Sequence, residues 1–235
     1  RAVDAAGIER LRFATSHPKD LTDEVIGLFA TLPSLMPALH LPVQSGSNRI
    51  LSAMNRRYTR EHYLGLIEKL RRARPDIALS TDIIVGFPGE TEEDFMDTYR
   101  LVEEVGYSQV FTFIYSKREG TPAAKMDDDT PREVIQERFD RLVDLVQRKA
   151  FEANQTELGA TVPVLVEGTS KRDDSILAGK SPKNQTVHAP LPEGASIEEL
   201  AGTTVRVRID EAKTWYLAGE VAGGAVPPAE AADGR

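Results

Sequence analysis

Short apolar runs alternate with helical patterns over the first two-thirds of the chain. Strands are predicted at residues 10–15, 39–43, 77–85 and 110–115. The segments between them repeat apolar residues at the helical spacing i, i+3, i+4 and i+7, for example Tyr63, Leu66, Ile67 and Leu70. Four successive strand–helix units predict a parallel α/β sheet or part of a barrel.

The number of units limits the architecture. Four strand–helix units are too few to close an eight-stranded barrel, so an open sheet or an incomplete barrel is favoured. The segment 77–85 is almost continuously apolar, which is typical of a parallel strand buried on both faces. Thr91 followed by Asp94 predicts a helix start close to a capping box.

The pattern changes after about residue 156. Three short strands are predicted, at 162–166, 186–189 and 205–209. In the last of them apolar residues alternate with Arg206 and Arg208, which places the basic side chains on one face. Such a small all-β module is expected to close into a barrel, because closure protects the strand edges. Residues 223–235 are rich in Ala, Gly and Pro and are predicted to be a disordered tail.

The amino-acid composition excludes several classes of function. The 235 residues include no cysteine, which excludes disulfides, cysteine-bound metals and a cysteine nucleophile within them. The net charge of −8 argues against a general nucleic-acid binder. Neither a membrane span nor a signal peptide is visible, so we expect a cytoplasmic protein without a membrane partner. The chain starts with Arg1 and not with methionine, which indicates processing or a piece of a longer protein.

Positive charge is concentrated in one segment. Residues 49–74 contain eight basic residues against two acids. A solvated helix face is the favoured interpretation, and a surface for phosphate groups is the alternative.

The residues after each predicted strand are polar and rich in turn formers. Ligands in parallel α/β folds bind at the carboxyl ends of strands, so these segments are expected to line one polar pocket. They are Thr15–Pro18, Gln44–Ser47, Gly86–Thr91 and Ser116–Pro122.

Individual residues in these segments have competing interpretations. Asp82 lies within an apolar strand, and a buried carboxylate requires a partner from the protein or a ligand. Gln44 and Ser45 either contact hydroxyls or a nucleobase, or cap the next helix. Tyr115 stacks on an adenine or fills the core, and the glycine turn at Gly86 is favoured as purely structural. No catalytic residue is assigned, and the four histidines lack the spacing of a zinc site, so no metal site is predicted.

Four of these segments together resemble the radical-SAM methylthiotransferases. The motifs are Thr15-Ser-His-Pro18, His40-Leu-Pro-Val-Gln-Ser-Gly-Ser-Asn48, Thr81-Asp-Ile-Ile-Val-Gly-Phe-Pro-Gly-Glu-Thr91 and Tyr115-Ser-Lys-Arg-Glu-Gly-Thr-Pro-Ala-Ala124. The stretch Met54-Asn-Arg-Arg-Tyr-Thr59 is most similar to the branch that acts on N6-isopentenyladenosine in the tRNA anticodon loop. The all-β module resembles a TRAM domain.

The resemblance implies a fold and a set of cofactors. The implied fold class is α/β: residues 1–155 would be the last four units of a partial (βα)6 radical-SAM barrel, and residues 156–222 an OB-like TRAM barrel. The parent enzyme would use S-adenosylmethionine and two 4Fe–4S clusters whose ligands lie outside this chain, so the fragment alone would be inactive. Residues expected at the cofactor by motif position are Gln44, Ser45, Asp82, Ile84, Val85, Gly86 and Tyr115.

The same resemblance implies an RNA partner, the tRNA anticodon stem-loop, and a monomer at full length. Residues 156–222 contain seven basic groups and ten acids, so RNA contact would depend on local placement. The candidates are Lys171, Arg172, Lys180, Lys183, Arg206, Arg208 and Trp215. Alternatives are a methylthiotransferase for threonylcarbamoyl-adenosine or a ribosomal protein, or a cluster-free RNA-binding module.

Overall fold

The computed structural model describes residues 2–12, 14, 17–127 and 129–223, and the chain divides into two units. We call residues 13–30 and 39–150 the sheet unit, and residues 1–12, 31–38 and 151–235 the barrel unit. The predicted tail lies outside the described residues except for Gly223.

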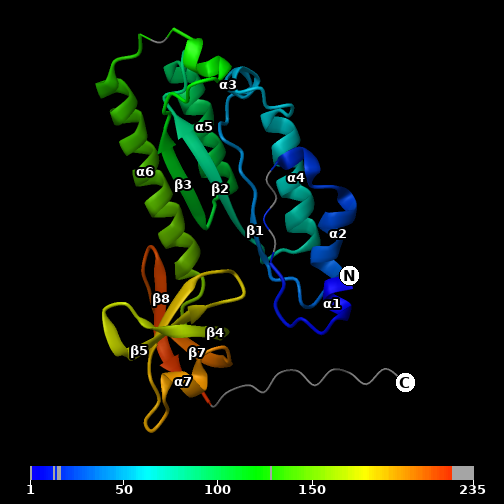
Figure 1. The fold of residues 1–235 in the computed structure, drawn as a ribbon, viewed down its shortest axis with the longest axis vertical. Helices are drawn as coiled ribbons and strands as arrows, with labels where there is room; N and C mark the ends of the chain where they lie inside the picture. Colours follow the sequence, from blue (N-terminus) through cyan, green and yellow to red (C-terminus); the bar gives the residue numbers. More distant parts are fainter. Residues whose placement is uncertain (1, 13, 15–16, 128, 224–235) are drawn as a thin grey trace. The chain divides into compact units, whose positions relative to one another are not determined.

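A three-stranded sheet forms the centre of the sheet unit, in the order β1-β2-β3. The strands are β1 (Ala38–His40), β2 (Ala78–Val85) and β3 (Gln109–Ile114). β2 and β3 run parallel, and their arrows point the same way in Figure 1. Three of the four predicted strands therefore form.

The predicted strand at 10–15 is wrong for the residues that the structure describes. Leu11 and Ala14 form only isolated bridges, while Phe13, Thr15 and Ser16 lie outside the description. Arg10 donates to the carbonyl oxygen of Lys180 at 2.9 Å, within the barrel unit. The backbone of Leu11 pairs only locally, accepting from the N–H of Met36 at 2.9 Å and donating to the carbonyl oxygen of Ser34 at 2.7 Å.

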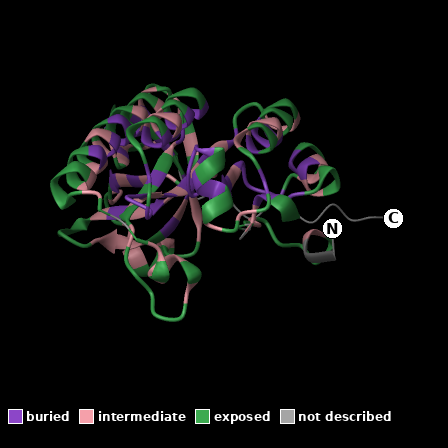
Figure 2. Cartoon of the chain, turned by 90° about the horizontal axis from the view of Figure 1, so that it is seen from above, coloured by how far each residue is buried: buried purple, intermediate pink, exposed green. Residues whose placement is uncertain are grey.

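Helices cover the sheet with their apolar faces, and Figure 2 shows their outer faces exposed. Their bounds are η1 (Pro18–Asp20), α2 (Asp23–Thr31), α3 (Asn48–Ala53), α4 (Arg60–Ala73), α5 (Glu92–Val105), η2 (Pro122–Lys125) and α6 (Arg132–Gln155). The predicted stripe Tyr63, Leu66, Ile67 and Leu70 is buried on α4. The hydroxyl of Tyr63 donates to the carbonyl oxygen of Leu41 at 2.9 Å, which ties α4 to the end of β1.

The barrel unit contains a closed five-stranded barrel in the order β4-β5-β6-β8-β7, together with the short helices α1 (Ala2–Ala5) and α7 (Ile197–Leu200). The strands are β4 (Thr161–Ser170), β5 (Asp173–Lys180), β6 (Thr186–Pro190), β7 (Thr204–Ala212) and β8 (Tyr216–Val221). The predicted alternation on β7 is confirmed: Val205, Val207 and Ile209 are buried in the core, while Arg206 and Arg208 are exposed.

Candidate functional site

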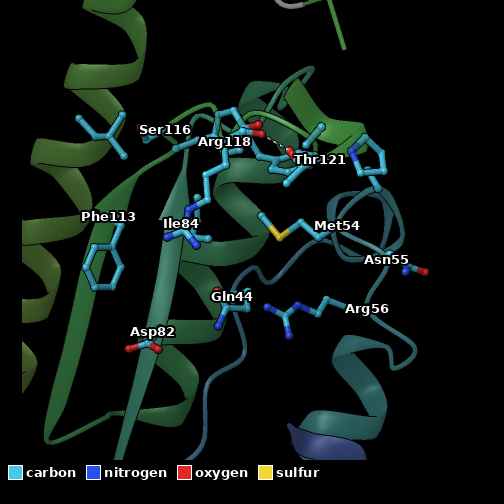
Figure 3. Close-up of a pocket in the computed structure, with 16 residues that line it drawn as sticks. Gln44, Met54, Asn55, Arg56, Asp82, Ile84, Phe113, Ser116, Arg118 and Thr121 are labelled. Carbon is cyan, nitrogen blue, oxygen red and sulfur yellow. Dashed lines mark hydrogen bonds between the residues drawn. The ribbon is translucent and has the colours of Figure 1, made fainter. Parts of the chain in front are cut away.

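A pocket of about 770 Å³ opens at the carboxyl ends of β2 and β3 (Figure 3). This is the edge at which the polar segments after the predicted strands were expected to line one pocket. It is lined by Gln44, Ala53, Met54, Asn55, Arg56, Asp82, Ile84, Phe87, Phe113, Ile114, Tyr115, Ser116, Arg118, Thr121, Pro122 and Ala123.

Gln44 reaches the pocket from a backbone conformation that side chains rarely adopt. Its φ is 74°, in the left-handed region. Its N–H donates to the carbonyl oxygen of Asp82 at 2.9 Å, and its own carbonyl oxygen accepts from the N–H of Ile84 at 3.0 Å. The backbone of Gln44 is therefore fixed against β2, which holds its side chain at the pocket in Figure 3.

The next three residues are fixed to α5. The Gly46 N–H donates to Oγ1 of Thr98 at 2.9 Å, and the Ser47 hydroxyl donates to Oδ1 of Asp94 at 2.6 Å. Ser45 is fully buried, and its hydroxyl lies 3.2 Å from that of Thr98. Ser45 thus contacts α5 and does not line the pocket.

The carboxylate of Asp94 accepts several hydrogen bonds at the start of α5. It completes a capping box with Thr91, as the sequence predicted, and also accepts from Arg49. Burial acts to raise the pKa of its carboxyl, but the hydrogen bonds from Arg49, Ser47 and Thr91 outweigh burial and hold that pKa well below its usual range. An ionised Asp94 therefore anchors the loop that carries Gln44.

Asp82 does not lie in a strand buried on both faces, contrary to the expectation. Residues of β2 alternate between buried and half-buried, and the Asp82 side chain is 28% exposed on the pocket face. Its partner is His40, whose Nε2 lies 3.5 Å from Oδ2 of Asp82. His40 is held in turn through Nδ1, 3.0 Å from the hydroxyl oxygen of Ser80.

The three motif residues after Asp82 separate in space. Ile84 lines the pocket, whereas Val85 is buried on the opposite face. Gly86 has φ of 71°, and an added Cβ would lie 2.6 Å from Cγ2 of Ile135. The turn thus requires glycine for both its conformation and its packing.

A buried carboxylate, which sequence reasoning did not single out, closes this turn. Oε2 of Glu90 accepts from the N–H of Gly86 at 2.9 Å, and Arg138 donates to the Glu90 carbonyl oxygen at 2.9 Å. Burial raises the pKa of Glu90 to about 7, against the opposing effects of the Gly86 N–H and Arg138. The Gly86 N–H is therefore occupied by the protein itself and is not left for a ligand.

Tyr115 places a buried hydroxyl group at the pocket. Its ring packs edge-to-face on Phe87, with centroids 5.2 Å apart. Among the described residues, its hydroxyl oxygen is the one buried side-chain polar atom without a hydrogen-bond partner. A buried hydroxyl without a partner is costly, so this atom points to a ligand or a water molecule as its partner.

The predicted RNA residues of the barrel unit fall into two groups. The basic side chains of the first group are already bonded to other residues of that unit. Lys183 pairs with Glu157 at 2.6 Å, Arg208 with Asp210 at 3.2 Å, and Lys180 donates to the Thr186 hydroxyl at 2.8 Å.

The second group has its charge available for a ligand. Lys171, Arg172 and Arg206 are exposed and have no carboxylate partner within the described part of the chain. Trp215 is 53% exposed, as a stacking platform requires.

The described residues offer neither a metal site nor a membrane-spanning helix. No group of three or more His, Asp or Glu side chains there is placed to hold a metal ion. No helix in that part of the chain has the length and apolar character to cross a membrane.

Comparison with known proteins gives two domain families. A model of the radical SAM superfamily matches residues 1–102, and a model of the TRAM domain matches residues 155–222. The fold is similar to that of coproporphyrinogen III oxidase from Escherichia coli, a radical SAM enzyme, with a TM-score of 0.50 and 12% identity over 85% of this chain and 46% of that one.

Curated relatives match almost all of the chain. The tRNA-2-methylthio-N(6)-dimethylallyladenosine synthase of Acetivibrio thermocellus is 52% identical over 215 residues, 92% of this chain and 44% of that protein. The synthases of Alkaliphilus oremlandii and Streptomyces viridosporus are 52% and 49% identical, over 92% and 91% of this chain and 45% and 42% of theirs. The chain thus spans just under half the length of these relatives, and over more than nine-tenths of its own length it is similar to tRNA-2-methylthio-N(6)-dimethylallyladenosine synthases.

Proposed function

We propose that the chain is the S-adenosylmethionine-binding and RNA-binding part of a tRNA methylthiotransferase that converts N6-isopentenyladenosine in the anticodon loop to its 2-methylthio derivative. The observation that carries the proposal is 52% identity over 92% of the chain to a synthase of that name. In this proposal residues 1–155 belong to a partial (βα)6 barrel, residues 156–222 form the TRAM domain, and the full-length enzyme is a monomer.

The pocket fits S-adenosylmethionine by its mixed chemistry. Ile84, Phe87 and Phe113 offer apolar surface for an adenine ring. Gln44 and Asp82 offer an amide and a carboxylate to the hydroxyl and ammonium groups of the cofactor. The Tyr115 hydroxyl needs a partner that such a ligand can supply. Ser45, Val85 and Gly86 would support the pocket walls from behind.

The residues do not fit an iron–sulfur cluster, which requires thiolate ligands that a chain without cysteine does not provide. We therefore propose that two 4Fe–4S clusters are bound by residues outside these 235. The chain alone is then expected to have no methylthiotransferase activity.

The proposed RNA partner is the anticodon stem-loop of tRNA. Lys171, Arg172 and Arg206 would contact phosphates, and Trp215 would stack on a base. Lys180, Lys183 and Arg208 would contribute less, because each is already engaged within the barrel unit.

Nucleoside mass spectrometry tests the reaction. In a strain that lacks the gene for this chain, tRNA should retain N6-isopentenyladenosine and lose its 2-methylthio derivative. The alternatives predict other losses: the methylthio group of threonylcarbamoyl-adenosine, or that of a ribosomal protein. Intact 2-methylthio-N6-isopentenyladenosine in the deletion strain would overturn the proposal.

Replacing Tyr115 by Phe tests the pocket. The change removes a hydroxyl that is unpaired in the free protein and paired in the proposed complex, so it should weaken S-adenosylmethionine binding by about three- to tenfold. Isothermal titration calorimetry measures the affinity. Tyr99→Phe is the matched control, because Tyr99 lies on α5 outside the pocket and should leave the affinity unchanged. Equal affinities of the two variants would show that the hydroxyl does not contact the cofactor.

A further inference from the structure

Two aromatic rings stack on the outer surface of the closed barrel. His188 lies on β6 and Tyr216 begins β8, and their ring centroids are 5.2 Å apart with an angle of 26° between the ring planes. The next residues toward the core, Val187 and Leu217, are fully buried within the barrel. Because side chains alternate across a strand, the two rings face outward. Neither residue belongs to the sets proposed for S-adenosylmethionine or for RNA.

Small residues flank His188 on both neighbouring strands. Its cross-strand partners are Ala178 of β5 and Ala218 of β8. Cross-strand partners on one face of a sheet have their Cβ atoms roughly 5 Å apart, so alanine at both positions leaves the imidazole ring standing above its surroundings. His188 and Tyr216 are half-buried, and part of the surface of each remains open to a ligand.

The loop that leads into Tyr216 is held in place before any ligand binds. The amide nitrogen of Asn154, a buried side chain at the end of α6, donates to the carbonyl oxygens of Lys213 and Thr214 at 2.8 and 3.1 Å. The N–H of Lys213 donates in turn to the carbonyl oxygen of Tyr216 at 2.9 Å. A surface that is already ordered loses less conformational entropy on binding, so the rings form a prearranged contact area.

Lys180 places a fixed positive charge next to the rings. It lies two residues after Ala178 on β5 and therefore on the same face, and its Nζ donates to the Thr186 hydroxyl at 2.8 Å. Burial, and to a lesser degree the charge of Lys180, lowers the pKa of His188, so its imidazole is neutral near pH 7. The rings thus offer flat uncharged faces beside one cation.

The acidic side chains of the adjoining strands do not neutralise this cation. A carboxylate oxygen of Glu220 on β8 lies 3.7 Å from a guanidinium nitrogen of Arg208, and one of Glu211 on β7 lies 2.5 Å from Nζ of Lys213. Both carboxylates therefore already have a partner. Lys180 forms no ion pair within the described part of the chain.

This combination selects the kind of ligand. Exposed aromatic rings bind cations, apolar side chains or nucleobases. A cation would be repelled by Lys180, and an apolar protein segment would remove its ammonium group from water. A single-stranded nucleic acid supplies flat bases for the rings and negative phosphates for the cation. A duplex does not, because its bases are stacked on one another and their faces are closed.

Resting on the proposed function, which supplies the RNA partner, we propose that His188 and Tyr216 form a stacking site for an unpaired base of the RNA. Trp215 directly precedes Tyr216 and is exposed, so the two rings adjoin a position already proposed to stack on a base. The barrel unit would thus hold unpaired nucleotides by their base faces, in addition to its phosphate contacts.

The test compares two RNA ligands by fluorescence anisotropy with the 235-residue chain. The double variant His188→Leu/Tyr216→Leu should bind a labelled single-stranded oligoribonucleotide of the anticodon loop at least about fivefold more weakly, because a base loses its stacking partner. The slope of log affinity against log salt should stay unchanged, since no phosphate contact is removed. The affinity for a fully paired RNA duplex should also stay unchanged.

Two single variants are the matched controls. Tyr216→Phe keeps both rings, and Tyr99→Leu removes a half-buried ring from α5, so each should bind the single strand as the unmodified chain does. If the double variant bound it as tightly as these controls, the inference would be overturned, an apolar protein segment would be left as the occupant of the rings, and the proposed function would stand. An equal loss for single strand and duplex, with a flatter salt slope, would also overturn the inference, because phosphate contacts would then be the ones affected.

Proton NMR of the unmodified chain gives an answer even if the double variant does not fold, which circular dichroism would reveal. The imidazole signals of His188, assigned by comparison with His188→Gln, should shift when the single strand is added, because the ring current of a stacked base acts at short range. Signals that stay in place at saturating single strand would overturn the inference. If the unmodified chain bound S-adenosylmethionine but no RNA, the proposed RNA role and this inference would both fail.

Discussion

Replacing Gly46 by Ala is expected to destabilise the chain by about 3 kcal/mol and to weaken S-adenosylmethionine binding. An added Cβ would lie 2.5 Å from the Asp97 carbonyl oxygen and 2.6 Å from the Cα of Thr98. Both atoms belong to the backbone of α5, which cannot move aside as a flexible side chain would. The loop must move instead, and Gln44 moves with it. Urea unfolding and calorimetry measure the two effects.

Gly65→Ala is the matched control for this substitution. Gly65 lies within α4 and has nothing within 4 Å of an added Cβ. Alanine should therefore stabilise the helix by about 0.5 to 1 kcal/mol, through its higher helix propensity. If Gly46→Ala were as stable as Gly65→Ala, the close contact between the loop and α5 would be contradicted.

Replacing Asp94 by Ala should cost about 3 to 5 kcal/mol, because the carboxylate is the common acceptor for Arg49, Ser47 and Thr91. The loss should depend on pH. The pKa of Asp94 is lowered in the folded chain, so its contribution is fully present above the unfolded pKa of about 4 and is lost progressively as the pH falls from there through the lowered folded pKa. The unfolding free energies of the unmodified chain and of the Asp94→Ala variant, measured from neutral to acidic pH, should therefore converge in acid.

Asp97→Ala supplies the comparison on the same helix. Asp97 is 37% exposed and makes long ion pairs, at 3.8 Å with Arg60 and 3.3 Å with Arg100. Exposed pairs of this kind contribute little, so the loss should stay below about 1 kcal/mol and change little with pH. A similar loss for both variants would show that Asp94 acts only as a surface charge.

The spacing of apolar residues correctly predicted those helices and strands whose apolar residues all face one packed surface. The α4 stripe and the alternation on β7 are examples, because each buries its apolar residues against one partner surface. β5 and β8 were missed because they contain charged residues and glycine, which favour turns. Gly219 in β8 shows why glycine belongs there: an added Cβ would collide with the backbone of Arg208 in β7.

The candidate site was predicted in outline. Gln44, Asp82, Ile84 and Tyr115 do line one pocket, because parallel strands bring their carboxyl ends to one edge. Ser45 and Val85 are adjacent to pocket residues in sequence, yet they face the other way. One residue along a loop or strand is enough to reverse the direction of a side chain.

Taken alone, the sequence determined the α/β and all-β parts, the absence of thiol chemistry and the edge at which a pocket forms, since these depend on local pattern and composition. The tertiary structure decided which charges are available. Partners such as Asp94 for Arg49 and Glu104 for Arg60 come from distant segments, which only the fold brings close enough to form ion pairs. The same fold leaves Arg56 and Arg118 without such a partner among the described residues.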